Sequence, residues 1–168
     1  MSDVAIRRNE IIELLYTYKK YSIKDVVKAL KAINVPVVAI SDFDLINHKQ
    51  DLKGVTDALG IDWDLALNAD MKTIYDDMNS KAGAWESIKK TGKAGFCGET
   101  FVAYSRVESV CKSAGLFVVP VGEMECFDKM VTKAKKDWVY EVIENCDLEN
   151  SPDLQEARRF VKEIAEFR

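Results

Sequence analysis

Four carboxylates stand in two closely spaced pairs, each directly after a short apolar segment. The first pair is Asp42 and Asp44, and the second is Glu123 and Glu125. Two carboxylates held close repel each other, and each raises the pKa of the other unless a cation lies between them. Oxygen ligands without nearby histidine or cysteine favour Mg²⁺, Mn²⁺ or Ca²⁺. The two pairs together predict a divalent metal site, whereas either pair alone also fits a helix cap or a solvated turn.

Three lysines follow the second acidic pair along the chain. Lys133, Lys135 and Lys136 precede Trp138 within a segment of helical pattern. Their ammonium groups are suited to hold a phosphate or to stabilise negative charge on a leaving oxygen. The alternative interpretation is a solvated helix face, which is the usual role of a run of charges.

The elements that must position these residues are two strands among helices. The apolar segments 35–40 and 116–121 have the length and β-branched content of buried parallel strands. Parallel strands with helices between them predict a three-layer α/β fold, in which a mostly parallel sheet is flanked by helices. Ligands bind beyond the carboxyl ends of such strands, where both acidic pairs fall. Helices are expected over 9–21, 23–33, 51–59, 63–78, 99–114, 132–144 and 153–167, and a glycine-rich loop over 83–98.

The composition is that of one soluble globular domain. Of the 168 residues, 48% are hydrophobic and 31% are charged, which argues against disorder. We expect a single domain over 1–168, with an N-terminal helical segment (1–21), a core (22–146) and a C-terminal helix (147–168). A net charge of −4 does not support binding of nucleic acid through bulk charge.

Cysteine and histidine usage excludes some classes of site. None of the four cysteines belongs to a C-x-x-C pair and the chain has one histidine, so neither structural zinc nor disulfides are expected. The sequence shows neither a signal peptide nor a stretch of about 20 apolar residues. These features predict a reduced, cytoplasmic protein outside the membrane.

The two acidic segments resemble a known family. The sequence VPVVAISDFD, which ends at Asp44, resembles the D-x-D strand of a TOPRIM domain. The sequence LFVVPVGEME, which ends at Glu125, resembles the second acidic strand end in the TOPRIM branch of OLD-family ATP-dependent endonucleases. The sequence KKDWV, starting at Lys135, resembles the helix that follows. The resemblance covers roughly residues 22–144.

This resemblance implies a Rossmann-like TOPRIM fold and metal-dependent cleavage of DNA. The family reaction usually uses two Mg²⁺ or Mn²⁺ ions, of which one activates water and the other stabilises the leaving oxygen. Asp42 and Asp44 would bind the first ion. Glu125, with Glu123 as the alternative, would help to bind the second.

The resemblance also implies partners and a departure from the family pattern. Lys136 or Lys135 would neutralise charge near the scissile phosphate, and Lys133, Lys135 and Lys136 would contact DNA. The glutamate strand that begins TOPRIM domains has no counterpart, and no G-x-x-x-x-G-K-[ST] loop for ATP is present. We therefore expect the carboxyl-terminal part of a larger ATPase–nuclease, with a sheet incomplete at its N-terminus. Absence of the family glutamate would cost the chain alone about 10²–10⁴ in rate.

Two other interpretations stay open. A catalytically incomplete remnant would act as a protein-interaction module, because an incomplete sheet leaves an unpaired edge that invites self-association. A phosphatase similar to the haloacid dehalogenases would use Asp42 as nucleophile and Asp44 as acid/base. In that case Asp76 and Asp77 would imitate the later acidic pair, although Leu45 and Ile46 stand where such enzymes usually carry glycine and threonine.

Overall fold

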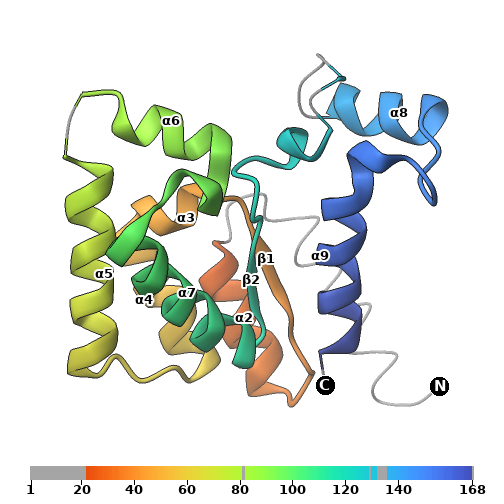
Figure 1. Cartoon of the computed structure of the whole chain (residues 1–168). Helices are drawn as coiled ribbons and strands as arrows, with labels where there is room; N and C mark the ends of the chain where they lie inside the picture. Colours follow the sequence, from red (N-terminus) through yellow and green to blue (C-terminus); the bar gives the residue numbers. More distant parts are fainter. Residues whose placement is uncertain (1–21, 81, 129, 132–135, 168) are drawn as a thin grey trace, which may run out of the picture. The chain divides into compact units, whose positions relative to one another are not determined.

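The computed structural model describes residues 22–80, 82–128, 130–131 and 136–167 (Figure 1). The chain divides into two compact units, residues 1–37 and 38–168. Helix α2 (Ile23–Ala32) belongs to the first unit, and every other described helix and strand belongs to the second. The elements of the second unit are β1 (Ala39–Ser41), α3 (Asp44–Asn47), α4 (Lys49–Leu59), α5 (Leu65–Met78), α6 (Ala84–Thr91), η1 (Gly92–Gly95), α7 (Gly98–Ser113), β2 (Leu116–Val118), η2 (Met124–Phe127), α8 (Lys136–Asn145), η3 (Pro152–Leu154) and α9 (Gln155–Glu166).

Helix α2 begins where the sequence predicts it. The side chain of Ser22 accepts a hydrogen bond from the backbone N–H of Asp25 at 3.3 Å. This contact satisfies one of the backbone donors that a helix N-terminus leaves without an intrahelical partner. The expected helix at 9–21 lies outside the described residues.

The expected three-layer α/β fold is wrong. The described residues are mostly helical, and their one sheet consists of β1 and β2, three residues each. The strands pair in parallel, with Ala39 opposite Leu116 and Ser41 opposite Val118. Ile40 on β1 remains 45% exposed, so this strand is not the doubly covered strand that its composition indicated. The two apolar segments were identified correctly as strands, but they do not extend into a Rossmann-like TOPRIM sheet.

Both strands are shorter than expected, β1 at its N-terminal end and β2 at its C-terminal end. Proline has no backbone N–H to donate to a sheet ladder, and it confines the preceding residue to extended conformations. Pro120 follows Val119, whose N–H still donates to the carbonyl of Ser41, whereas β1 pairs only from Ala39, beyond Pro36. Asp42 directly follows β1, whereas Glu123 comes after a turn that begins at the end of β2.

The region 83–98 is not a loop. It contains α6 and η1, and its glycines stand at the ends of these elements. Ala84 and Ile88 are four residues apart and both are buried, so they form an apolar stripe on α6. Gly83 and Gly92 have positive φ angles and bound the helix at its two ends. A loop prediction based on glycine content therefore missed a helix.

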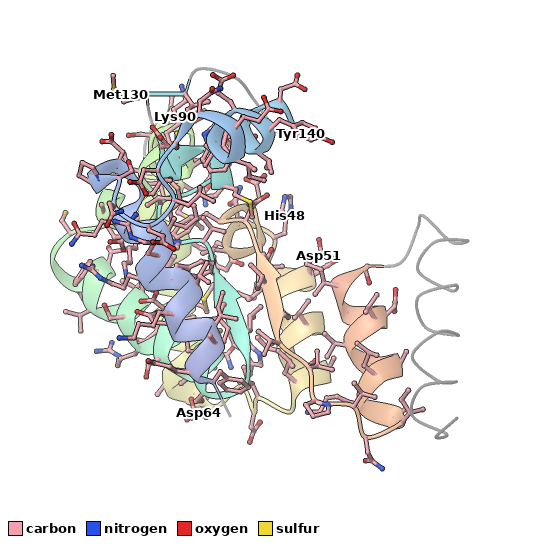
Figure 2. All side chains as sticks on the ribbon, turned by 90° about the vertical axis from the view of Figure 1, so that its right-hand side faces the viewer. His48, Asp51, Asp64, Lys90, Met130 and Tyr140 are labelled. Carbon is pink, nitrogen blue, oxygen red and sulfur yellow. The ribbon has the colours of Figure 1, made fainter. Side chains whose placement is uncertain are left out.

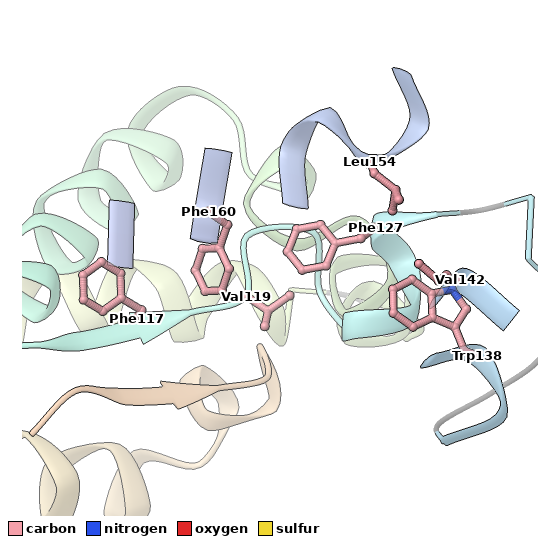
Figure 3. Packing of buried hydrophobic residues seen from close by; sticks show 7 residues of the cluster. All are labelled: Phe117, Val119, Phe127, Trp138, Val142, Leu154 and Phe160. Atoms are coloured by element: carbon pink, nitrogen blue, oxygen red, sulfur yellow. The ribbon is translucent and has the colours of Figure 1, made fainter. Parts of the chain in front are cut away.

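Strand β2 lies between α7 on one side and α9 on the other (Figure 1). The ring of Phe117 on β2 meets that of Phe160 on α9 edge to face, with centroids 6.4 Å apart. An ion pair also connects α7 with α9: the ammonium of Lys112 lies 2.7 Å from a carboxylate oxygen of Glu163. A buried cluster continues from here to α8 (Figure 3), and its members are Phe117, Val119, Phe127, Trp138, Val142, Leu154 and Phe160.

Candidate functional site

The exits of the two strands are tied to each other by backbone hydrogen bonds. The N–H of Val119 donates to the carbonyl of Ser41 at 2.9 Å, which continues the ladder beyond β2. The N–H of Phe43 donates to the carbonyl of Gly122 at 3.0 Å. These two bonds hold the turn that carries Asp42 beside the turn that carries Glu123. The parallel register of the short sheet thus brings the two acidic segments together.

Phe43 fixes the direction of the first acidic pair. Its side chain is 0% exposed and packs on the rings of Phe96 and Tyr104, with centroids 5.9 and 5.3 Å away. A buried ring of this size anchors the backbone on both sides of it. Asp42 and Asp44 flank this anchor and line the surface of the unit.

Lys89 of α6 joins the two acidic segments. Its Nζ atom lies 3.0 Å from Oδ2 of Asp44 and 3.2 Å from Oε1 of Glu123. The side chain of Lys89 is 33% exposed, so the ammonium is only partly screened by water. Sequence reasoning missed this residue because region 83–98 was expected to be a loop. No spacing rule links a lysine to a carboxylate 45 residues away.

Two glycines bring α6 close enough for this contact. A Cβ atom on Gly92 would collide with the carbonyl of Pro120 and the backbone nitrogen of Gly122. The N–H of Lys93 also donates to the carbonyl of Pro120 at 3.0 Å. The end of α6 therefore packs backbone to backbone against the turn after β2. This close approach places Lys89 next to Glu123.

A cavity of about 490 Å³ opens at this junction. Carboxylates from both strand exits, the α6 lysine and apolar side chains form its wall. Such a mixture of apolar surface and a few convergent polar groups is typical of ligand sites. We call this cavity the acidic pocket, and it is lined by Asp42, Asp44, Lys89, Glu123, Met124, Glu125, Trp138 and Val139.

The electrostatic potential in the acidic pocket is negative, because four carboxylates and only one lysine line it. Partial burial raises the pKa of Asp42, and repulsion from the neighbouring carboxylates, Glu125 first, raises it further. The charge of Lys89 opposes this shift. Conversely, hydrogen bonds to Asp44 and Glu123 raise the pKa of Lys89. The pocket therefore disfavours a further negative charge and favours an added cation.

The structure brings four of the sequence-predicted residues to one place. Asp42, Asp44, Glu123 and Glu125 all line the acidic pocket. Lys133 and Lys135 lie outside the described residues. Lys136 is the first residue of α8, but the position of its side chain is outside the described part as well.

The acidic residues that the phosphatase interpretation requires lie elsewhere. Asp76 and Asp77 are on α5, and Asp76 forms an exposed ion pair with Lys72 at 2.5 Å. Neither of them is among the residues that line the acidic pocket. Leu45, which follows the first acidic pair, is buried in α3.

The donor types of the acidic pocket fit Mg²⁺ or Mn²⁺, since all of them are carboxylates. Their arrangement is not a finished metal site. Among the described residues, no three histidine, cysteine, aspartate or glutamate side chains converge in a geometry that could hold a metal ion. Two of the carboxylates instead contact the Lys89 ammonium.

Comparison of the chain with protein-family models, with curated protein sequences and with solved structures gave no match. Within the part of the chain that the structure describes, no helix has both the length and the apolar character needed to cross a membrane.

Proposed function

We propose that the acidic pocket takes part in divalent-cation-dependent hydrolysis of phosphodiester bonds in DNA. One observation carries this proposal: carboxylates from the exits of both parallel strands line one open cavity together with a lysine. A divalent cation bound by such carboxylates supplies charge neutralisation and an activated water for attack on phosphorus. The resemblance of the two acidic segments to TOPRIM strand ends supports the same chemistry.

The residues of the pocket divide into two roles in this proposal. Asp42 and Glu125 would provide carboxylate oxygens for a cation. The pKa of Asp42 is raised by partial burial and then by the neighbouring carboxylates, and a cation would relieve the second effect. Lys89 provides a positive group beside them, suited to contact a phosphate oxygen. Met124 and Trp138 contribute apolar surface to the wall of the pocket.

The test is a plasmid-nicking assay in Mn²⁺ with purified protein. The assay compares the parent chain, the double variant Asp42→Asn, Asp44→Asn and the control Asp62→Asn, whose carboxylate is exposed and lies outside the pocket. Nicking by the parent and the control, with a loss of at least about a hundredfold in the double variant, would support the proposal. Equal nicking by all three proteins would show a contaminating nuclease, and no nicking by the parent would contradict activity of this chain on its own.

A second function, a protein-interaction module, is favoured by a different observation. Tyr140 (Figure 2) and Ile143 lie three residues apart on α8, and both are more than half exposed. Exposed apolar side chains near one another are typical of contact surfaces. A parent chain that does not nick DNA but self-associates, with self-association abolished by Tyr140→Ser, Ile143→Ser, would favour this module. Sedimentation velocity makes that measurement.

A further inference from the structure

The charge of the chain is divided unevenly between its two compact units. Residues 1–37 carry seven lysines and arginines against four aspartates and glutamates, which gives this unit a net charge of +3. Residues 38–168 carry 17 against 24, which gives a net charge of −7. The overall value of −4 therefore hides a small positive unit. An asymmetry of this kind within one chain indicates contact with a polyanion, either nucleic acid or an anionic membrane.

Helix α2 gathers lysines of the positive unit on one face. Lys24, Lys28 and Lys31 are spaced four and three residues apart, so they lie on the same side of the helix. At the rise of an α-helix this row is about 10 Å long. Lys28 and Lys31 are exposed, and Lys24 is partly exposed. Neither Lys24 nor Lys28 forms a hydrogen bond or an ion pair within the described part of the chain, so both ammonium groups are open to a ligand.

The one carboxylate of α2 is engaged at the start of the helix. Oδ2 of Asp25 accepts a hydrogen bond from Oγ of Ser22 at 2.7 Å. This hydrogen bond and, after it, the charges of Lys24 and Lys28 lower the pKa of Asp25. Asp25 therefore offsets part of the positive charge of the face, but it forms an ion pair with neither lysine.

The apolar side of α2 distinguishes between the two kinds of polyanion. A helix that lies in a membrane surface needs an apolar face that is free to enter the lipid. On α2, Val27 is 2% exposed, and Val26 and Leu30 are only partly exposed. Of the large apolar side chains of this helix, only Ile23 is exposed, at 37%. Because most of the apolar side is already covered, the lysine row suits the phosphates of a nucleic acid better than a membrane.

We propose that the lysine face of α2, formed by Lys24, Lys28 and Lys31, binds the phosphate backbone of double-stranded DNA. This inference deepens the proposed function and rests on it for the choice of DNA. The negative potential of the acidic pocket repels phosphates, so attraction of DNA needs a positive surface elsewhere on the chain. Each strand of duplex DNA carries one phosphate per about 3.4 Å of axis, so a row of this length faces about three phosphates. Contacts of this kind hold DNA without reading its sequence.

The test measures binding of a short fluorescently labelled DNA duplex by fluorescence anisotropy, at several salt concentrations. The buffer contains EDTA, so metal-dependent cleavage does not interfere. The parent chain is compared with the double variant Lys24→Gln, Lys28→Gln, which removes two charges from the lysine face. The matched control is Lys49→Gln, Lys53→Gln, because these two lysines are exposed, have the same four-residue spacing on α4 and belong to the negative unit.

We expect the α2 double variant to bind DNA at least about tenfold more weakly than the parent at low salt. The plot of log K against log salt concentration should also become less steep by about 2, since each lost phosphate contact removes about one unit of slope. The α4 control and the charge-conserving variant Lys24→Arg, Lys28→Arg should bind like the parent. Far-UV circular dichroism checks that each variant is folded. If the double variant does not fold, Lys28→Gln alone is measured, with about half the change in slope.

Four results would overturn the inference. The parent could fail to bind DNA, or the α2 double variant could bind as tightly as the parent. Equal losses in the α2 variant and the α4 control would indicate a general charge effect. Binding of the parent to phosphatidylserine vesicles in preference to DNA, at the same salt concentration, would assign the lysine face to a membrane.

Failure of the proposed function gives a different pattern. In that case the plasmid stays intact in Mn²⁺, while the parent still binds the duplex in EDTA and the α2 double variant still loses that binding. The reverse pattern, in which the parent and the α2 double variant nick the plasmid and bind the duplex equally well, would keep the proposed function and overturn the role of α2.

Discussion

The backbone of Gly122 packs directly against the carbonyl oxygen of Lys89, in a space that no Cβ atom could share. Gly122 also has a φ of +102°, a conformation that residues with side chains rarely adopt. This single contact connects the exit of β2 with the helix that carries the lysine of the acidic pocket. The geometry of the pocket therefore depends on a glycine that carries no functional group.

We expect Gly122→Ala to lower the free energy of unfolding by about 3 kcal/mol or more, because strain at positive φ adds to a backbone collision. Gly83→Ala is the control: Gly83 has a φ of +80°, but a Cβ there would meet nothing within 4 Å. The control should lose only about 1 kcal/mol, from backbone strain alone. Urea unfolding followed by circular dichroism measures both, and equal losses would refute the close packing at Gly122.

We expect Phe43→Ala to destabilise the protein by about 3–5 kcal/mol, since it removes a fully buried ring between the two aspartates. Phe101→Ala should cost about 1 kcal/mol or less, because Phe101 on α7 is 44% exposed. Chemical denaturation of the two variants gives the comparison. A Phe43→Ala loss no greater than that of Phe101→Ala would contradict the anchoring role.

Asp70 on α5 should make the free energy of unfolding depend on pH at acidic values. Hydrogen bonds from Arg106 of α7, with Nε 2.8 Å from Oδ2, hold the pKa of Asp70 below its usual value of 3.8. A lowered native pKa gives stability that is present above pH 3.8 and is lost as the pH falls through the native value. Asp70→Asn should therefore be less stable than the parent at pH 7, by about 1–3 kcal/mol.

Urea unfolding of the parent and of Asp70→Asn, at pH 7 and near pH 2.5, tests this ion pair. The difference between the parent and Asp70→Asn should be largest at pH 7 and should shrink at low pH. Asp62→Asn should show no such difference at either pH. A gap between the parent and Asp70→Asn that stays constant over this range would exclude the ion pair as its cause.

For Asp42 we expect the opposite dependence of stability on pH. Its pKa is raised in the folded state, so the stability that its protonated form contributes is present below pH 3.8 and is lost as the pH rises through the higher native value. At pH 7 the ionised Asp42 therefore costs stability, and Asp42→Asn should raise the melting temperature by on the order of 1–2 °C. A melting temperature below that of the parent would show that the ionised carboxylate is stabilising. Melts at pH 7 and pH 3.5, with Asp62→Asn as control, make this measurement.

Local signals in the sequence predicted several elements correctly. Ser22 caps α2 with Asp25 three residues later, as a capping pattern indicates. Gly60 ends α4 with a φ of +90°, as expected for a glycine after a helix. Trp138 is buried in the core, as is usual for a large aromatic side chain. Each of these features depends on residues within one or two turns of each other, or on burial of a large side chain.

Local sequence signals could not predict the number of strands in the sheet. Apolar, β-branched segments predict strands, but they carry no information on how many neighbours each strand has. Ile40 illustrates the limit, since it is β-branched and yet largely exposed on β1. Extending two strands to a three-layer fold assumed further strands, and the described chain forms helices instead.

The sequence by itself determined that two acidic pairs follow two strands, because apolar runs, prolines and carboxylates are local features. Only the tertiary structure decided that these pairs share one pocket and that Lys89 joins them. Asp44 and Lys89 meet because parallel pairing of β1 with β2 and the backbone contact of Gly92 with Gly122 act together. Contacts of this kind join segments far apart in the chain, and their energy comes from packing that no single segment contains.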